Sequence, residues 1–218
     1  MKIEYLGHAS FLLTTSAGTR IVTDPFDASA YPDELKYRGF DATADIVTIS
    51  HDHSDHSAAS VVKGMPIIIK GDGNYKAEEV DFLGVGTFHD DDRGAKRGKN
   101  TVFVISVDGM RIAHMGDLGH VLTSDQAAEI GSVDVILIPI GGYYTIDAGQ
   151  AWKVAEQLSA KVVIPMHYKN EKCFFPISGL EDFIEGRENV ERKAKSTIEV
   201  TPQNLPDEQR VFIMEPSL

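Results

Sequence analysis

The residues His51-Asp52-His53-Ser54-Asp55-His56 concentrate three imidazoles and neighbouring carboxylates within six consecutive positions. They directly follow Asp45–Ser50, whose β-branched residues predict a buried strand. Strand geometry points the first two histidines to the same side, and the following turn can aim the last two residues at a neighbouring point. A polar, solvated loop is the alternative, but the whole chain contains only eight histidines. The motif therefore predicts two ligands for each of two adjacent metal ions, at the end of a strand.

Composition places the chain among ordinary globular proteins. It has 218 residues, of which 42% are hydrophobic and 25% charged, so it is long enough to bury a real core. We find no linker or repeat and expect one domain over residues 1–218. No stretch reaches the roughly 20 apolar residues of a membrane span. The amino terminus reads directly into a strand without a secretory hydrophobic region, so we expect a cytoplasmic location.

Charge and cysteine content narrow the chemistry. The formal net charge of −12 argues against a nonspecific nucleic-acid binder, because neutralising phosphates requires a basic face. A small anionic substrate held by a local basic patch and metal ions stays open. Cys173 is the only cysteine, so any metal must be held by His and carboxylate, which suits Zn, Mn or Fe. We expect Cys173 itself to be a small buried hydrophobe rather than a nucleophile.

The pattern of apolar residues predicts one α/β domain with two sheets enclosed by helices. Alternating or continuous apolar runs predict strands at Ile3–Leu6, Ser10–Thr15, Arg20–Asp24, Asp45–Ser50, Pro66–Lys70, Glu79–Phe88, Thr101–Val107, Arg111–His114, Asp134–Pro139, Lys161–Pro165, Ile198–Val200 and Arg210–Met214. Helices are predicted at Ala58–Lys63, at Asp125–Ile130 with Ser124 as cap, at Ala148–Ser159 with Asp147 as cap, and at Gly179–Ile184. Asp108-Gly109 predicts a tight hairpin, and residues 27–43 predict a surface loop over the site.

Three further polar residues stand just past the end of an apolar run, as His51 does. His89 follows Val85–Phe88, Asp117 follows the run that begins at Ile112, and His167 follows the run that begins at Val162. Because ligands commonly bind outside the carboxyl ends of strands, this recurrence predicts one shared site.

This pattern resembles the metallo-β-lactamase superfamily over nearly the whole chain. The family pattern has an early Asp after a strand, then H-x-H-x-D-H, then His, Asp and His after successive strands. Here these are Asp24, the motif at 51–56, His89, Asp117 and His167. The resemblance implies a four-layer αββα sandwich with a two-metal site at one edge. Short segments are similar to a compact branch of metal-dependent hydrolases allied to L-ascorbate-6-phosphate lactonase and N-acyl-phosphatidylethanolamine phospholipase D: Gly7–Phe11, Thr23–Pro25, Gly116–His120 and Pro165–Tyr168.

The resemblance also implies the ligands of two divalent ions: His51, His53 and His89 for the first, Asp55, His56 and His167 for the second, and Asp117 for both. Zinc is the first expectation, with manganese or iron as alternatives. Two ions about 3.5–4 Å apart can hold a hydroxide between them as the nucleophile, its pKa lowered towards ~7. Asp55 can orient that water, and Asp24 is expected to hold a ligand imidazole in one tautomer.

Other residues carry weaker signals. His8 and His120 are candidates for catalytic proton donors or charge stabilisers, and a structural role is equally open for each; His114, within a strand, is expected to be structural. Gly141–Thr145 can line the pocket or be a plain loop before a helix. The cations after His89 can grip a substrate phosphate or carboxylate, or simply be solvated: Arg93, Lys96, Arg97 and Lys99.

The favoured function is a binuclear metal-dependent hydrolase acting on a small, anionic ester, lactone or phosphodiester. We expect a small-molecule substrate, no nucleic-acid partner and no membrane span, with a homo-oligomer open. The alternatives are a metal-dependent nuclease and a non-catalytic metal-binding protein of the same fold. Reduction of oxygen or nitric oxide at a di-iron centre is disfavoured. Proteins of this fold with that activity typically have Glu at the position of His53, and a flavin domain follows. On the ligands alone, glyoxalase-II-like thioesterases and true β-lactamases stay open, but the former usually carry an extra helical domain and the latter a secretion signal.

Overall fold

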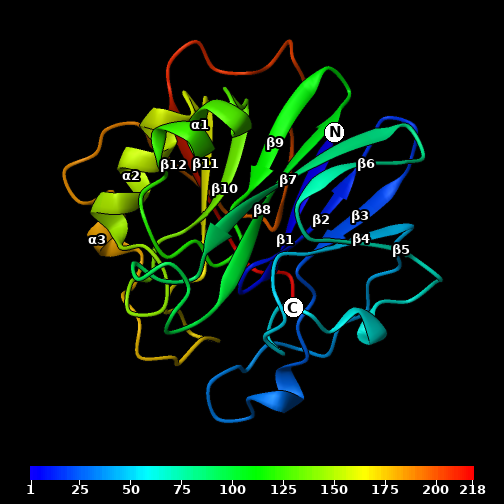
Figure 1. Cartoon of the computed structure of the whole chain (residues 1–218), viewed down its shortest axis with the longest axis horizontal. Coiled ribbons are helices and arrows are strands. Elements are labelled where there is room, and N and C mark those ends of the chain that lie inside the picture. Colours follow the sequence, from blue (N-terminus) through cyan, green and yellow to red (C-terminus); the bar gives the residue numbers. More distant parts are fainter.

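Two β-sheets stack face to face in the computed structural model, which describes residues 1–218 (Figure 1). The first sheet contains β1 (Lys2–Gly7), β2 (Ser10–Thr14), β3 (Arg20–Thr23), β4 (Ile46–Ile49), β5 (Ile67–Lys70) and β13 (Thr197–Glu199). The second contains β6 (Gly73–Ala77), β7 (Val80–Phe88), β8 (Lys99–Val107), β9 (Met110–His114), β10 (Val135–Pro139), β11 (Val162–Met166), β12 (Val190–Lys193) and β14 (Arg210–Met214). Their orders are β13-β1-β2-β3-β4-β5 and β12-β14-β11-β10-β9-β8-β7-β6.

Strand direction decides where the site lies. In the first sheet β2 runs antiparallel to both β1 and β3, and β4 runs parallel to β3. In the second sheet β8 runs antiparallel to both β7 and β9, while β10 and β11 run parallel to β9. Strands β1, β3 and β4 therefore end at one edge of their sheet, and β7, β9 and β11 end at one edge of theirs. Six strands thus deliver the residues that follow them to two sheet edges.

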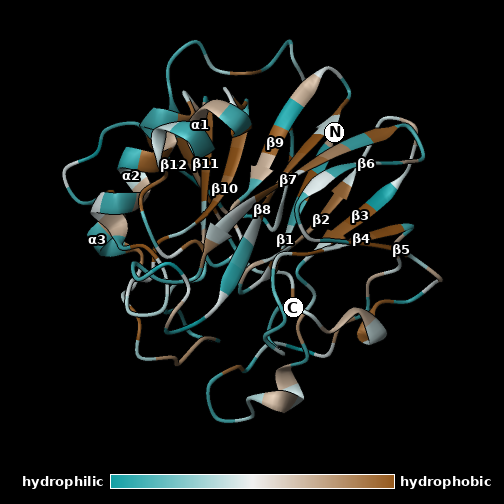
Figure 2. Cartoon of the chain, in the orientation of Figure 1, coloured by the Kyte–Doolittle hydropathy of each residue, from teal (hydrophilic) through white to brown (hydrophobic).

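The core between the sheets follows from the alternation of side chains along each strand. On β8, Phe103 and Ile105 face the first sheet, while Val102 and Val104 belong to the cluster under the helices. The other strands that cross the core repeat this alternation, and Figure 2 shows them as the most hydrophobic part of the chain. Because apolar side chains are buried on both of its faces, the second sheet packs against the first sheet on one side and against the helices on the other.

Helices cover only the outer face of the second sheet (Figure 1): α1 (Ser124–Ile130), α2 (Ala148–Gln157) and α3 (Glu181–Ile184). Both longer helices begin with a capping box, Thr123 with Gln126 for α1 and Asp147 with Gln150 for α2. Such boxes satisfy backbone N–H groups that would otherwise lack partners. None of the helices has the length and apolar character needed to cross a membrane.

The outer face of the first sheet is covered by loops with two 3-10 turns, Ala28–Ala30 and Ala59–Val61. Their apolar side chains form a third cluster with the sheet, which includes Phe26, Leu35 and Cys173. The cluster confirms that Cys173 is buried.

The predicted α/β sandwich of two sheets is confirmed, with corrections. Loops with two 3-10 turns, rather than helices, cover the outer face of the first sheet. The helix expected at Ala58–Lys63 is wrong, because the chain makes only one 3-10 turn there before β5. Thr123, not Ser124, caps α1, since its hydroxyl accepts from the Gln126 N–H. Strands β6 and β12 were not predicted; their sequences, GNYKA and VERK, are mostly polar because both lie at sheet edges. The hairpin at Asp108-Gly109 is confirmed, with φ of 55° and 73°.

We expect Leu137→Ala to lower the free energy of unfolding by about 2–5 kcal/mol, because Leu137 is fully buried between the sheets and the change leaves a cavity. Ile68→Ala is the matched control, since Ile68 is 47% exposed on the edge strand β5 and surface changes cost about 0.5 kcal/mol or less. Urea unfolding of both variants measures the difference. Equal losses would contradict this description of the core.

Candidate metal centre

Histidine and aspartate side chains from both sheets meet where the six strands end. His8 follows β1, Asp24 follows β3, and the motif at 51–56 follows β4; His89, Asp117 and His167 follow β7, β9 and β11. His8, Asp24 and His167 have φ of 53°, 39° and 50°, in the left-handed region that few non-glycine residues adopt. Such strained backbone concentrates at functional sites.

The first group of potential ligands is His51, His53 and His89, whose ligand atoms all lie within 4.8 Å of one another. His51 Nε2 lies 3.1 Å from His53 Nδ1. His51 and His89 are buried, whereas His53 is exposed. Three ring nitrogens thus converge, with one of them accessible from outside.

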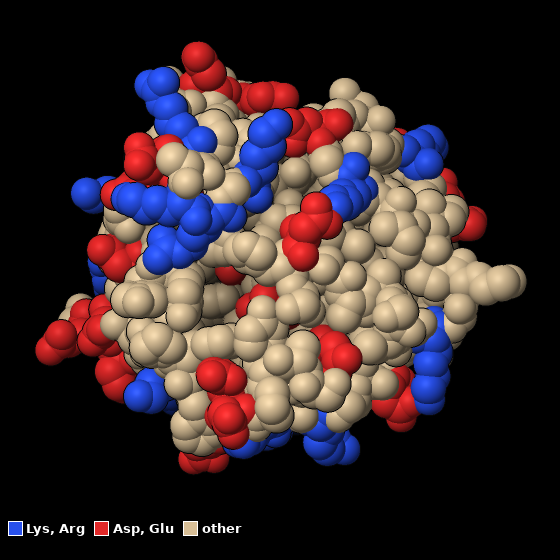
Figure 3. Space-filling view, turned by 60° about the horizontal axis from the view of Figure 1, so that its bottom comes forward, with Lys and Arg blue, Asp and Glu red and all other residues tan.

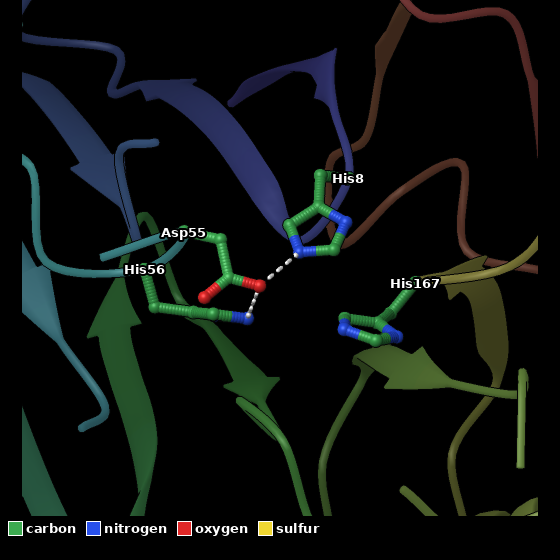
Figure 4. Close-up of side chains that lie close together, drawn as sticks. All are labelled: His8, Asp55, His56 and His167. Atoms are coloured by element: carbon green, nitrogen blue, oxygen red, sulfur yellow. Dashed lines mark hydrogen bonds and ion pairs between the residues drawn. The ribbon is translucent and has the colours of Figure 1, made fainter. Parts of the chain in front are cut away.

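The second group is His8, Asp55, His56 and His167, again with ligand atoms within 4.8 Å of one another (Figure 4). His8 Nε2 lies 3.1 Å from Asp55 Oδ2, and His56 Nε2 lies 3.7 Å from the same oxygen. All four residues are buried. His8 therefore lies within this group, in contact with Asp55.

The carboxylate of Asp117 lies between the two groups. Its Oδ2 is 3.1 Å from His89 Nε2, 4.0 Å from His51 Nε2 and 3.4 Å from His167 Nε2. Its Oδ1 is 3.3 Å from His56 Nε2. One buried carboxylate thus faces two imidazoles from each group.

Asp24 and Ser50 hold two of these imidazoles in place. His56 Nδ1 lies 2.9 Å from Asp24 Oδ2, the same oxygen that accepts the Ser50 hydroxyl proton at 2.5 Å. Because that proton is committed to Asp24, the Nδ1–H of His51 donates to Ser50 Oγ at 2.9 Å. Both contacts leave Nε2 of His51 and His56 directed into the site. This matches the role expected for Asp24; the sequence had no signal for Ser50.

Burial and the neighbouring charges shift the pKa values of the site residues in different directions. Burial and the neighbouring His56 lower the pKa of His51 to about 3, and burial lowers the pKa of His167 to about 3. Although burial lowers it, the carboxylates of Asp117 and Asp55 raise the pKa of His56 well above its ordinary value. Burial raises the pKa of Asp117, but His167 and His56 hold it well below the usual range. At neutral pH the carboxyl group of Asp117 is therefore ionised, His51 and His167 are neutral, and His56 carries a proton.

The residues present fit divalent metal ions. Within this site, His56 Nε2 and Asp117 Oδ1 are fully buried and lie 3.3 Å apart, but neither makes a hydrogen bond of good geometry. Buried polar atoms in native structures almost always have a partner, and a cation between them would provide one. Imidazole nitrogens and carboxylate oxygens, with no thiolate, suit Zn, Mn or Fe.

The cluster forms the floor of a small cavity of about 280 Å³. It is lined by Tyr31, His53, Asp55, His89, Arg97, Asp117, Tyr144, His167 and Phe175. Figure 3 shows a hollow on this face of the molecule, with acidic side chains at its floor and Lys and Arg side chains beside it. Tyr31 comes from the predicted surface loop and Tyr144 from Gly141–Thr145, so both segments line the cavity.

The candidate His120 and the strand residue His114 lie outside this cluster. His120 donates from Nδ1 to the Val121 carbonyl at 2.9 Å and accepts the Phe88 N–H at Nε2. Both ring nitrogens are thus occupied by backbone, and His120 does not line the cavity. His114 donates to the Ala9 carbonyl from within β9, which is the structural role expected for it.

Comparisons with known proteins agree with this geometry. The profile of the β-lactamase superfamily domain matches residues 2–167. The chain belongs to this superfamily. A metal-dependent hydrolase of Pyrococcus furiosus is 32% identical over 198 residues, which cover 77% of this chain and 84% of the relative. A metal-dependent hydrolase of Carboxydothermus hydrogenoformans is 33% identical with the same coverage. The enzyme class expected from the sequence, a metal-dependent hydrolase of this superfamily, is confirmed.

Solved structures support the same fold. A Thermotoga maritima protein, named as a Zn-dependent hydrolase of the metallo-β-lactamase superfamily, superposes with a TM-score of 0.82 and 42% identity over 98% of both chains. A metallohydrolase of Ignicoccus hospitalis superposes with a TM-score of 0.66 and 24% identity, over 99% of this chain and 95% of its own. The second likeness bears on the fold alone.

The low pKa values of His51 and His167 predict a pH dependence for the metal-free protein. Between pH 6 and pH 4 the unfolded chain protonates these histidines, whose ordinary pKa is about 6.5, while the folded chain does not. The free energy of unfolding therefore falls as pH falls through this window. His167→Asn removes one titrating group and makes the slope shallower by up to about 1.4 kcal/mol per pH unit. Urea midpoints at several pH values measure this, and an unchanged slope would contradict it.

Asp24→Asn should weaken metal binding about 10- to 100-fold, because an amide cannot accept from His56 and Ser50 as the carboxylate does. Asp52→Asn is the matched control within the histidine motif, since Asp52 is exposed and paired with Lys70. Competition with a chromophoric chelator gives the affinities. Similar affinities for the two variants would show that Asp24 does not support the ligands.

Proposed function

We propose that the chain is a binuclear metal-dependent hydrolase that acts on a small, anionic ester, lactone or phosphodiester. One observation carries the proposal: two groups of ligand atoms share the carboxylate of Asp117 at the floor of a cavity open to solvent. A purely structural metal site is closed, whereas a catalytic site keeps an open position. The small cavity favours a small-molecule substrate over a polymer.

The proposed ligands are those that the resemblance implies. His51, His53 and His89 would hold one ion, Asp55, His56 and His167 the other, and Asp117 both. We keep zinc as the first choice, with manganese or iron as alternatives. Bound there, two divalent ions would supply Lewis-acid polarisation and lower the pKa of a bound water.

Asp55 and His8 have distinct roles in this proposal. Asp55 lines the cavity, and although burial raises its pKa, His56 and His8 lower it, so it is a carboxylate at neutral pH. A carboxylate there can accept a hydrogen bond from an attacking water and fix its orientation. His8 is 1% exposed and does not line the cavity, so it reaches substrate only through Asp55. We therefore treat His8 as a positioning residue, and we leave His120 out of the reacting groups.

The alternatives fit less well. A nuclease needs a basic groove for its polymer, but the chain carries a net charge of −12 and the cavity is small. A non-catalytic metal protein would not need an accessible ligand such as His53 at the floor of a cavity.

The test is reconstitution of the metal-free protein with Zn or Mn, followed by assays on chromogenic phosphodiesters, lactones and esters. We expect metal-dependent turnover of one class, lost with chelator and lowered at least about 100-fold in His53→Ala, more than the 10–100-fold cost of losing an outer partner. Absence of turnover across the panel, with two metal equivalents bound per chain, would contradict the hydrolase proposal. Equal turnover by the wild-type protein and by His53→Ala would contradict the ligand assignment.

His8→Ala should lower kcat about 10-fold with little change in KM, because Asp55 loses the partner that orients it. His8→Gln places an amide N–H near the same point and should restore part of the rate. The pH–rate profile gives a second readout, since the acidic limb should shift in His8→Ala as the pKa of Asp55 rises. Equal losses in the Ala and Gln variants, with an unshifted profile, would favour a purely structural role.

A further inference from the structure

Arg97 is the one cation of the loop after β7 that lines the cavity. Arg93, Lys96 and Lys99 are exposed, and Lys96 pairs with Asp91. Arg97 is half-buried and takes part in no ion pair or side-chain hydrogen bond. The loop thus supplies a single uncommitted positive charge to the cavity wall.

The backbone of this loop is fixed from beneath by Asp90. The Asp90 carboxylate accepts the backbone N–H groups of Asp92, Gly94, Lys96 and Arg97 at 2.8, 2.8, 2.9 and 2.7 Å. Burial raises the pKa of Asp90, but these four N–H groups, with that of Arg97 foremost, lower it to about 2. At neutral pH the Asp90 carboxylate therefore holds the backbone of this loop in place through four hydrogen bonds. The backbone of Arg97, from which its side chain extends, has a defined position.

Two aromatic rings lie beside the Arg97 side chain. Its guanidinium carbon lies 5.5 Å from the centre of the Tyr144 ring and 5.9 Å from that of Tyr143. A cation this close to an aromatic ring is attracted by the ring and keeps its N–H groups, so it can still donate to an anion. The two rings therefore restrict the Arg97 side chain beside the cavity and lower the entropy lost when it binds oxygen anions.

The rest of the wall is apolar. Phe175 lies 6.0 Å from the Tyr144 ring and 5.5 Å from the Tyr31 ring, centre to centre. These rings line the same cavity of about 280 Å³ as Arg97 and the ligand groups. One small molecule can therefore contact the floor, the rings and Arg97 at the same time.

We propose that Arg97 binds a carboxylate or phosphate group of the substrate that is separate from the bond to be cleaved, and that it determines the preference for anionic substrates. Tyr144 and Phe175 flank the short apolar part between the anion and the scissile bond. This inference rests on the proposed function, in which Asp55 orients the attacking water at the floor of the cavity. Carboxylates and phosphates share the paired oxygen atoms that a guanidinium recognises.

The experiment compares a neutral ester with two esters whose acyl chains carry an added anionic group. 4-Nitrophenyl acetate is neutral, mono-4-nitrophenyl succinate adds a carboxylate, and 4-nitrophenyl 3-phosphonopropionate replaces it by a phosphonate. We expect the metal-loaded enzyme to prefer one charged ester over the acetate in kcat/KM, and the favoured one distinguishes the two anions. Arg97→Met should reduce that preference at least about tenfold, as for a lost hydrogen bond to a charged group. Arg93→Met makes the same chemical change in the exposed part of the loop and should retain it.

Binding separates this inference from hydrolysis itself. N-(4-Nitrophenyl)succinamic acid and 4-nitroacetanilide are the matched amides, and calorimetry on the metal-loaded protein needs no turnover. Tighter binding of the acid, lost in Arg97→Met but not in Arg93→Met, supports the anion site even if ester hydrolysis fails. No preference for the acid in the wild-type protein, or equal losses in the two variants, overturns it.

Discussion

The buried carboxylate of Asp117 is the constraint around which the site is arranged. It lies within 4.0 Å of a ring nitrogen from His51, His56, His89 and His167. An isolated charge at this depth would be costly, so both sheets must bring polar partners to the same point. Strands β1, β3 and β4 run in one direction in the first sheet, and β7, β9 and β11 run in one direction in the second. Each set of three strands ends at one sheet edge, and His or Asp follows every one of these strands.

Close backbone approach is the cost of this convergence, and glycine makes it feasible at two places. Gly116 has φ of 55°, and a Cβ atom there would lie 2.3 Å from Asn100 Oδ1 and 2.5 Å from Ser50 Cβ. A Cβ atom on Gly119 would lie 2.2 Å from the backbone nitrogen of Asp90. The residues on either side of Asp117 thus pack directly against the segments that carry His51 and His89.

The layered fold and the location of the site could be predicted from the sequence because both depend on local patterns. Apolar runs mark the strands, and a polar residue after each run marks a strand end. The separate fates of His8 and His120 could not be predicted, since both follow glycine and only tertiary contacts direct one to Asp55 and the other to backbone. The role of Ser50 could not be predicted either, because its hydrogen-bond partner Asp24 is 26 residues away in the sequence. The loops that cover the outer face of the first sheet carry no periodic apolar pattern, so their structure could not be predicted from the sequence.

We propose that this one cluster holds two metal ions that share Asp117. Diffraction data collected on both sides of the zinc absorption edge, from crystals of the zinc-loaded protein, locate the bound ions. We expect two anomalous peaks beside the Asp117 carboxylate, one among His51, His53 and His89 and the other among Asp55, His56 and His167. A single peak, or peaks away from Asp117, would show that the two ions do not share this carboxylate.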